Sequence, residues 1–325
     1  MVGDPHAEQS ELDDCRALVD LLVHHVKLWK PDLVLFLGDQ HHNHALVHLE
    51  VLGFWKQAFD RIKEVGKPFG TRIATLVGNH DMPGNGSSKN HAMLAYDIEV
   101  ADKILVLSDH CAAISYCGSE EEFLTCLNAL PTETKTVFCH QTFDGSKYEN
   151  GFYAKDGFNL EGLERWEFIS GHIHTPQEFA NVKYVGAPRW RTVSDANVDR
   201  YIWCMELDNG VATLAGKIAT DTHCNPMYYY IDREQEPINV EDIDLTKGQT
   251  IVDIYGAPEW VDERVKLWGN SRIRTFPVVE RMGSVQESKG IHVALAEYMD
   301  AYKPSESIKK EDLRAIVNKR LGLSL

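Results

Sequence analysis

Short apolar stretches that stop at a polar residue recur through the first 190 residues and constrain the fold more than any other feature. "DLVLFLGD" (32–39), "TRIATLVGNHD" (71–81), "TKTVFCH" (134–140) and "WEFISGHIH" (166–174) each run from apolar residues into Asp, Asn or His. Continuous apolar runs of this length are typical of strands buried on both faces of a parallel sheet. "NVKYVGAP" (181–188) is a further short strand that ends in a turn.

Helical patterns lie between these strands. "SELDDCRALVDLLVHHVKLWK" (10–30) has apolar residues at helical spacing, with Ser10 and Asp13 as the expected capping pair and Pro31 as its end. A second helix is expected over 43–65. Alternating strands and helices predict a layered α/β fold, in which functional residues collect at the carboxyl ends of the strands.

The sequence pattern changes beyond about residue 200. β-rich pieces such as "YIWCMEL" (201–207) and "TIVDIYGAP" (250–258) lack the polar strand ends. We expect residues 1–220 to form a catalytic domain and residues 221–325 a smaller C-terminal α+β cap module. The tail at 287–325 predicts two amphipathic helices separated by "KPSES", the second either packed on the protein or docked on a partner.

Composition excludes several classes of protein. The apolar runs are far shorter than the roughly 20 residues that cross a bilayer, and the first fourteen residues are acidic, so we expect an intracellular, cytoplasmic protein without membrane contact. Seven Cys without a C-x-x-C pair indicate neither a disulfide framework nor a thiolate zinc site. A net charge of −16 disfavours nucleic-acid binding over the whole surface but leaves a local cleft open.

The polar residues at the strand ends are those that metal ions prefer. In chain order they are Asp4 and His6 in "GDPH", Asp39 in "GDQHH", Asn79 and His80 in "GNHD", His140 in "FCHQ", and His172 and His174 in "GHIH". Two divalent cations about 4 Å apart form a clamp for phosphoryl chemistry, and one carboxylate must bridge them. Nitrogen and oxygen ligands without thiolate suit Mn, Fe or Zn.

D-x-H, G-D, G-N-H-D, H and G-H-x-H in this order resemble the calcineurin-like metallophosphoesterase family over about residues 1–190. The resemblance implies a layered β-sandwich flanked by helices and in-line attack of water on phosphorus. It also implies two divalent metal ions, the first held by Asp4, His6 and His174, the second by Asn79, His140 and His172, with Asp39 bridging them. His80 would stand beside the phosphate as a proton donor or charge stabiliser.

The position of "GDPH" departs from the family pattern. Only Met1 and Val2 precede it, where relatives have several apolar residues that form the first central strand. Either this strand is very short or the chain starts late within it, and a short strand would hold the first metal less rigidly. The alternative is that "GDPH" is an ordinary turn.

Three features resemble DNA-repair nucleases of the bacterial SbcD type and their phage counterparts. His42 follows Asp39 by three residues, where several of these nucleases have a His near the substrate; the alternative is a solvated His. "YVGAPRWRTVSDANVDRYIW" (184–203) offers Arg189, Trp190 and Arg191 as substrate-binding residues; the alternative is an edge hairpin. The C-terminal module resembles a nuclease cap, although it has no recognisable motif.

The loop "TFDGSKYENGFYAKDGFNLEG" (142–162) is long for a connection and is either a mobile substrate loop or an irregular surface excursion. The reading favoured by the resemblance is a DNA exonuclease or endonuclease of repair or recombination, with Mn²⁺ as the expected metal and Mg²⁺, Fe²⁺ or Zn²⁺ as alternatives. Its implied partners are DNA, an SbcC-like ATPase and, through the helix at 43–65, a second copy in a homodimer.

Two other functions remain open at this point. "GDQHHNH" (38–44) lacks the G-D-x-V-D-R-G run of serine/threonine phosphatases. The alternative enzyme is therefore a phosphodiesterase or phosphatase that acts on small molecules, such as cyclic nucleotides or dinucleotides. The other alternative is an inactive metal-binding scaffold. The presence of His80 speaks against a scaffold, which has no need for it.

Overall fold

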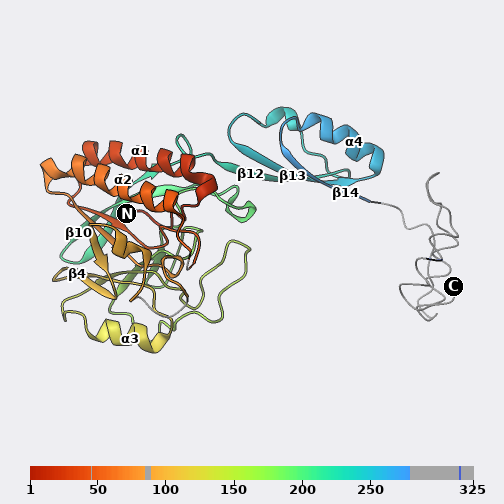
Figure 1. Cartoon of the computed structure of the whole chain (residues 1–325). Coiled ribbons are helices and arrows are strands. Elements are labelled where there is room, and N and C mark those ends of the chain that lie inside the picture. The colour runs from red at the N-terminus through yellow and green to blue at the C-terminus, as the bar shows by residue number, and fades with distance from the viewer. Residues whose placement is uncertain (45, 85–88, 279–314, 316–325) are drawn as a thin grey trace, which may run out of the picture. The chain divides into compact units, whose positions relative to one another are not determined.

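The computed structural model describes residues 1–44, 46–84, 89–278 and 315 (Figure 1). The chain divides into two compact units. The first comprises Met1–Tyr230, Glu241–Val252 and Asn270–Arg272, and it contains every predicted site residue; the second comprises Ile231–Val240, Asp253–Gly269 and the described part of Ile273–Leu325. The domain boundary at 220–221 stays a prediction.

Two sheets form the centre of the first unit. The smaller is parallel, in the order β1 (Leu33–Phe36), β2 (Arg72–Leu76) and β3 (Glu99–Ala101). The larger has the order β4-β5-β6-β7-β9-β8, with strands β4 (Ile104–Ser108), β5 (Cys111–Ile114), β6 (Thr136–Cys139), β7 (Glu167–Ser170), β8 (Gln177–Phe179) and β9 (Val182–Tyr184). Its four central strands, β5, β6, β7 and β9, run parallel.

The buried apolar residues form three layers: one lies between the two sheets, and one covers the outer face of each sheet. Leu35 and Leu76 of the small sheet share one buried cluster with Phe138 of the large sheet, so the two sheets pack face to face. Because successive side chains of a strand point to opposite faces, Val34 and Phe36 face outward onto α1 (Leu12–Trp29) and α2 (Leu49–Gly66). Helix α3 (Glu120–Asn128) packs outside the large sheet.

Figure 1 shows α1 and α2 side by side on one side of this unit and α3 on the opposite side. The predicted α/β architecture, a β-sandwich flanked by helices, is therefore confirmed.

The N-terminal segment pairs with β1 and with the residues that follow it. Val2 pairs in parallel with Phe36, and Ala7 pairs with His41. The Val2 amide donates to the Leu35 carbonyl at 2.9 Å, and the Val2 carbonyl accepts from Leu37 at 2.9 Å. The segment that carries "GDPH" is thus paired with a neighbouring segment and is not a free turn.

Two details of the helix predictions are wrong. No side chain caps α1: its N-cap is Glu11, and Asp13 instead accepts a hydrogen bond from Arg16 at 2.5 Å. Helix α2 begins at Leu49 and not at residue 43.

The remaining described elements follow in the chain. Strands β10 (Tyr201–Asp208) and β11 (Val211–Ala219) form an antiparallel hairpin, and β12 (Met227–Arg233), β13 (Gln249–Gly256) and β14 (Arg272–Pro277) form a third sheet in this order. Helix α4 (Pro258–Leu267) lies between β13 and β14 in the chain. The helices predicted over 287–325 fall outside the described residues apart from residue 315. Among the helices that the structure describes, none is long and apolar enough to cross a membrane.

Candidate metal centre

The predicted ligands meet at one edge of the sandwich, where parallel strands of both sheets end. Asp39 follows β1, Asn79 and His80 follow β2, His140 follows β6, and His172 and His174 follow β7, while Asp4 and His6 come from the segment that pairs with β1. Residues drawn from the first 174 positions therefore form one cluster, as the strand-end pattern predicted.

Asp39 lies at the centre of the cluster. Its Oδ2 is 3.5 Å from His6 Nε2 and 3.3 Å from His140 Nε2, and its Oδ1 accepts the His80 amide hydrogen at 2.9 Å. Two sets of side chains, Asp4–His6–Asp39 and Asp39–His140–His172, each bring ligand atoms within 4.8 Å of one another. The carboxylate common to both sets is placed as a bridging ligand would be.

The first set contains buried polar atoms that have no protein partner. Asp4 Oδ1 accepts the His172 amide hydrogen at 2.8 Å, but Asp4 Oδ2 and His6 Nδ1 are buried without a hydrogen bond. His6 Nε2 lies 2.9 Å from His174 Nε2. A buried polar atom without a partner costs about 1–3 kcal/mol, so this set fits a bound cation, which would satisfy those atoms.

The second set has its ligand atoms already oriented. Asn79 Oδ1 lies 3.0 Å from both His140 Nε2 and His172 Nδ1. His140 Nδ1 donates to the Leu37 carbonyl at 2.7 Å, so Nε2 is the atom that would bind a cation after losing its proton. A backbone carbonyl that fixes the tautomer in this way is typical of metal-binding His.

Opposite charges hold the cluster together. Burial raises the pKa of Asp4 to about 6, although His140 opposes this shift. Burial would also raise the pKa of Asp39, but His140 and His6 outweigh it and hold that pKa well below its usual range. Burial disfavours the charged form of His140, yet Asp39 and Asp4 raise its pKa to about 9. The carboxylates therefore favour positive charge at this place.

The backbone of the cluster is strained at three residues. The backbone φ angles of His6, Asp39 and His172 are 45°, 54° and 77°, values that residues other than Gly rarely adopt. Such strain costs of order 1–3 kcal/mol for each residue and gathers at functional sites. Gly78 allows the close approach of β2 to Asp39, because a Cβ there would lie 2.0 Å from Asp39 Oδ1.

His80 and His42 lie beside the first set. The His80 ring centroid is 4.7 Å from that of His6, and His80 Nδ1 donates to the His42 carbonyl. The His42 ring stacks on His80 at 5.5 Å, and its Nδ1 accepts from Arg191 Nη1 at 2.9 Å. Burial, aided by Arg191, lowers the pKa of His42 to about 4, so this ring is neutral at pH 7.

Arg189 and Trp190 need a correction, because both side chains point into the protein. Arg189 is 1% exposed and donates to the carbonyls of Pro5 at 2.7 Å and His6 at 2.6 Å. Trp190 is buried, and its Nε1 donates to the Val198 carbonyl. Both side chains are buried and bonded to backbone carbonyls, and Arg189 holds the backbone on which His6 stands.

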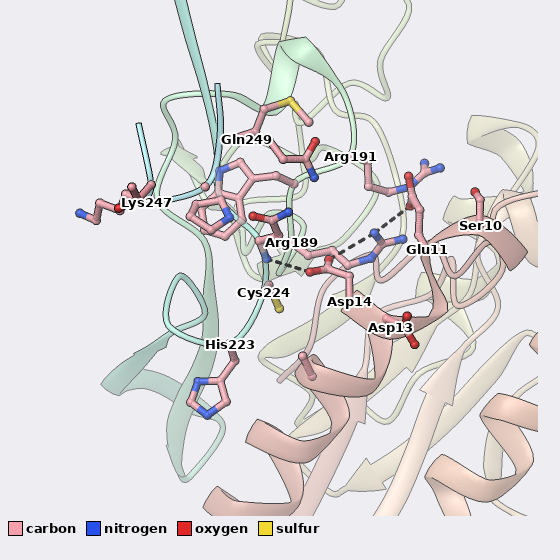
Figure 2. Close-up of a pocket in the computed structure, with 17 residues that line it drawn as sticks. Ser10, Glu11, Asp13, Asp14, Arg189, Arg191, His223, Cys224, Lys247 and Gln249 are labelled. Carbon is pink, nitrogen blue, oxygen red and sulfur yellow. Dashed lines mark hydrogen bonds and ion pairs between the residues drawn. The ribbon is translucent and has the colours of Figure 1, made fainter. Parts of the chain in front are cut away.

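Figure 2 shows Glu11 beside the two arginines, at the wall of a pocket of about 610 Å³. Glu11 Oε2 accepts from Arg189 at 2.8 Å and from Arg191 at 2.9 Å. Arg191 is only partly buried and also reaches Glu8 and His42. Of the three predicted substrate residues, Arg191 alone combines partial exposure with a contact to the cluster.

Three supporting carboxylates had no predicted role. Asp81 accepts from the His41 and Gly78 amides at 3.0 Å each. Glu149 accepts the His174 amide hydrogen at 2.8 Å, and Asp195 lies 3.8 Å from His174 Nδ1. Asp81 stands inside "GNHD" and could have been singled out, whereas nothing in the sequence near Glu149 or Asp195 indicates the contact.

Comparison with known proteins agrees with this geometry. The family model described as calcineurin-like phosphoesterase matches residues 1–176. A curated relative, exonuclease subunit 1 of Enterobacteria phage T4, is 31% identical over 153 residues, which is 43% of this chain and 43% of the relative. The aligned part thus spans less than half of that protein. Since the family model covers more than half of the 325 residues, the chain belongs to the calcineurin-like phosphoesterase family.

Proposed function

We propose that the protein is a metal-dependent phosphodiesterase that cleaves DNA as an exonuclease or endonuclease. The observation that carries the proposal is the position of Asp39, which two sets of metal-capable side chains share. The unpartnered Asp4 Oδ2 beside it supports a cation at the same place.

Members of the family usually bind two divalent cations, and the donor set suits that number. The first would be held by Asp4, His6 and His174, the second by Asn79, His140 and His172, and both by Asp39. Bound cations supply charge for the phosphate oxygens and lower the pKa of water. Oxygen and imidazole ligands favour Mn²⁺, with Mg²⁺, Fe²⁺ or Zn²⁺ as alternatives.

His80 is the proposed proton carrier. Because its Nδ1 donates to the His42 carbonyl, Nε2 is the atom that exchanges a proton with the leaving oxygen. Burial, the largest influence, lowers the pKa of His80, so the neutral ring is favoured before substrate arrives. A bound phosphate would supply negative charge and stabilise the protonated form.

Support for DNA as the substrate comes from the relative and from the rim of the site. The T4 protein is named as an exonuclease subunit, and by analogy the present chain would act with a further subunit, an ATPase of the SbcC type. Arg191 places a guanidinium next to His42, where a backbone phosphate would be attracted. We also propose residues 221–325 as a module that caps the site, and a homodimer as the assembly.

A panel of substrates with Mn²⁺ tests this function: linear duplex DNA, single-stranded DNA, cyclic dinucleotides and a chromogenic phosphodiester. We expect release of nucleotides from DNA. Cleavage of cyclic dinucleotides alone would favour a small-molecule phosphodiesterase, and metal uptake without any hydrolysis would favour a scaffold.

His80→Ala tests the proton carrier separately. A general acid contributes about 10²–10⁴-fold to the rate, so kcat should fall by that range while both metals stay bound. The matched control is His110→Ala, which removes a His from the turn before β5, at the opposite ends of the parallel strands. Turnover of His80→Ala near the rate of the unmodified protein would remove His80 from the mechanism.

A further inference from the structure

The loop between β6 and β7 has a firmly held base. The Ser146 hydroxyl lies 2.8 Å from the Tyr184 hydroxyl, and the buried Ala154 donates its amide hydrogen to the Ser146 carbonyl at 2.7 Å. Lys147 and Tyr153 form an antiparallel bridge. The loop is therefore a small hairpin built on the large sheet.

The tip of this hairpin presents two aromatic rings to solvent. Tyr148 donates its amide hydrogen to the Phe152 carbonyl at 2.8 Å, and Gly151 donates to the Tyr148 carbonyl at 2.9 Å, which closes the turn. Phe152 and Tyr153 follow directly and are 72% and 64% exposed. Scattered apolar residues on a surface need no explanation, but here two consecutive rings on one hydrogen-bonded turn are both exposed, and we call this pair the platform.

The same tip touches the metal centre. Glu149 Oε1 accepts the amide hydrogen of His174 at 2.8 Å and lies 3.9 Å from His174 Nδ1. Phe152 is the third residue after Glu149, and a chain of that length spans at most about 10 Å. The platform therefore belongs to the same turn that contacts the metal centre at His174.

We propose that Phe152 and Tyr153 stack on an unpaired nucleobase next to the scissile phosphate, an inference that rests on the proposed function. Aromatic rings are the usual stacking surface for single-stranded nucleic acid, and they accept every base because each has a π-face. The exposed Lys147 and Lys155 of the loop are balanced by the exposed Asp144 and Asp156. Stacking and not charge would therefore carry this contact.

The test compares the double variant Phe152→Ala/Tyr153→Ala with the unmodified protein in metal-free buffer containing EDTA, where cleavage does not interfere. Binding of a fluorescent single-stranded oligonucleotide is measured beside that of an abasic strand of equal length. We expect the variant to bind the normal strand about 10-fold more weakly and the abasic strand equally. Phe152→Tyr should retain the affinity.

Phe69→Ala is the matched control, because Phe69 is 40% exposed and lies just before β2, at the opposite ends of the parallel strands. Equal affinity of the double variant and the unmodified protein for the normal strand would overturn the inference. So would an equal loss on the abasic strand, or an unmodified protein that binds the two strands alike or not at all.

Hydrolysis of a small chromogenic phosphodiester with Mn²⁺ separates this inference from the proposed function. We expect the double variant to hydrolyse that compound at the original rate, since the compound does not need the stacking platform. An unmodified protein that hydrolyses no phosphodiester at all would refute the proposed function, whatever the binding experiment shows.

Discussion

The two halves of the metal centre are built in different ways. The half with Asn79, His140 and His172 stands at the ends of paired strands, and a neighbouring backbone carbonyl, that of Leu37, orients His140. The half with Asp4 and His6 stands on a segment that pairs with β1 and with the residues that follow it. Arg189 holds that segment from 183 residues away in the chain. The second half rests on the strand ends, whereas the first also needs the Arg189 side chain to hold its backbone.

The largest loss of metal binding and activity is expected for a change of Asp39, which the two halves of the metal centre share. Asp39→Asn removes the charge that both sets share, so we expect weaker binding of both cations and loss of several kcal/mol of transition-state stabilisation. Each 1.36 kcal/mol is tenfold, so kcat/KM should fall by about 1,000-fold or more. Isothermal titration with Mn²⁺ and a rate assay measure this, with circular dichroism to show that the fold persists. One cation bound with unchanged affinity would show that Asp39 does not bridge.

A smaller effect, confined to the first half, is expected for Arg189→Met. The change keeps volume but removes the donors to Pro5 and His6 and leaves Glu11 without this partner. Loss of a residue that orients a ligand typically costs 10–100-fold in metal affinity, so the first cation should bind more weakly by about that factor. Loss of the two hydrogen bonds to buried carbonyls should also lower the stability of the fold, measured by urea unfolding.

Arg16→Met is its control, since Arg16 forms an exposed pair with Asp13 and contributes little. Equal weakening of both cations in Arg189→Met would abolish the distinction between the halves.

The smallest effect is expected for Asp81→Asn in the second half. Asp81 accepts from the amides of Gly78, the residue before Asn79, and of His41, two residues after Asp39. The neutral amide keeps the shape and one acceptor oxygen, so we expect about tenfold weaker binding of the second cation and little change at the first. A two-site Mn²⁺ titration reports it. A change at the first cation alone would reverse our assignment of Asp81 to the second half.

The candidate metal ligands at the sheet edge could be predicted from the sequence better than the residues that hold them in place. Asp39, Asn79 and His140 follow apolar runs directly, so a local pattern was enough to place them together. Arg189 was misjudged because a charge next to an aromatic residue is typical of a nucleic-acid contact, and nothing nearby shows that its donors face Pro5 and His6.

Contacts between residues far apart in the chain left no signal in the sequence. The same holds for the unusual backbone conformations. Glu149 meets His174 only through the fold of the hairpin between β6 and β7. Asp39 and His172 have left-handed backbone conformations although neither is glycine, the residue that would have revealed them. Helix α3 was missed because its nine residues are few for a periodic pattern to stand out.

Anomalous diffraction from crystals soaked in Mn²⁺ tests the metal centre most directly. We predict two anomalous peaks, both within coordination distance of the Asp39 carboxylate, one also contacting Asp4 and His174 and the other His140 and His172. A map with no peak at Asp39, or with Asp4 and His174 at separate places, would contradict the shared site on which the proposed function stands.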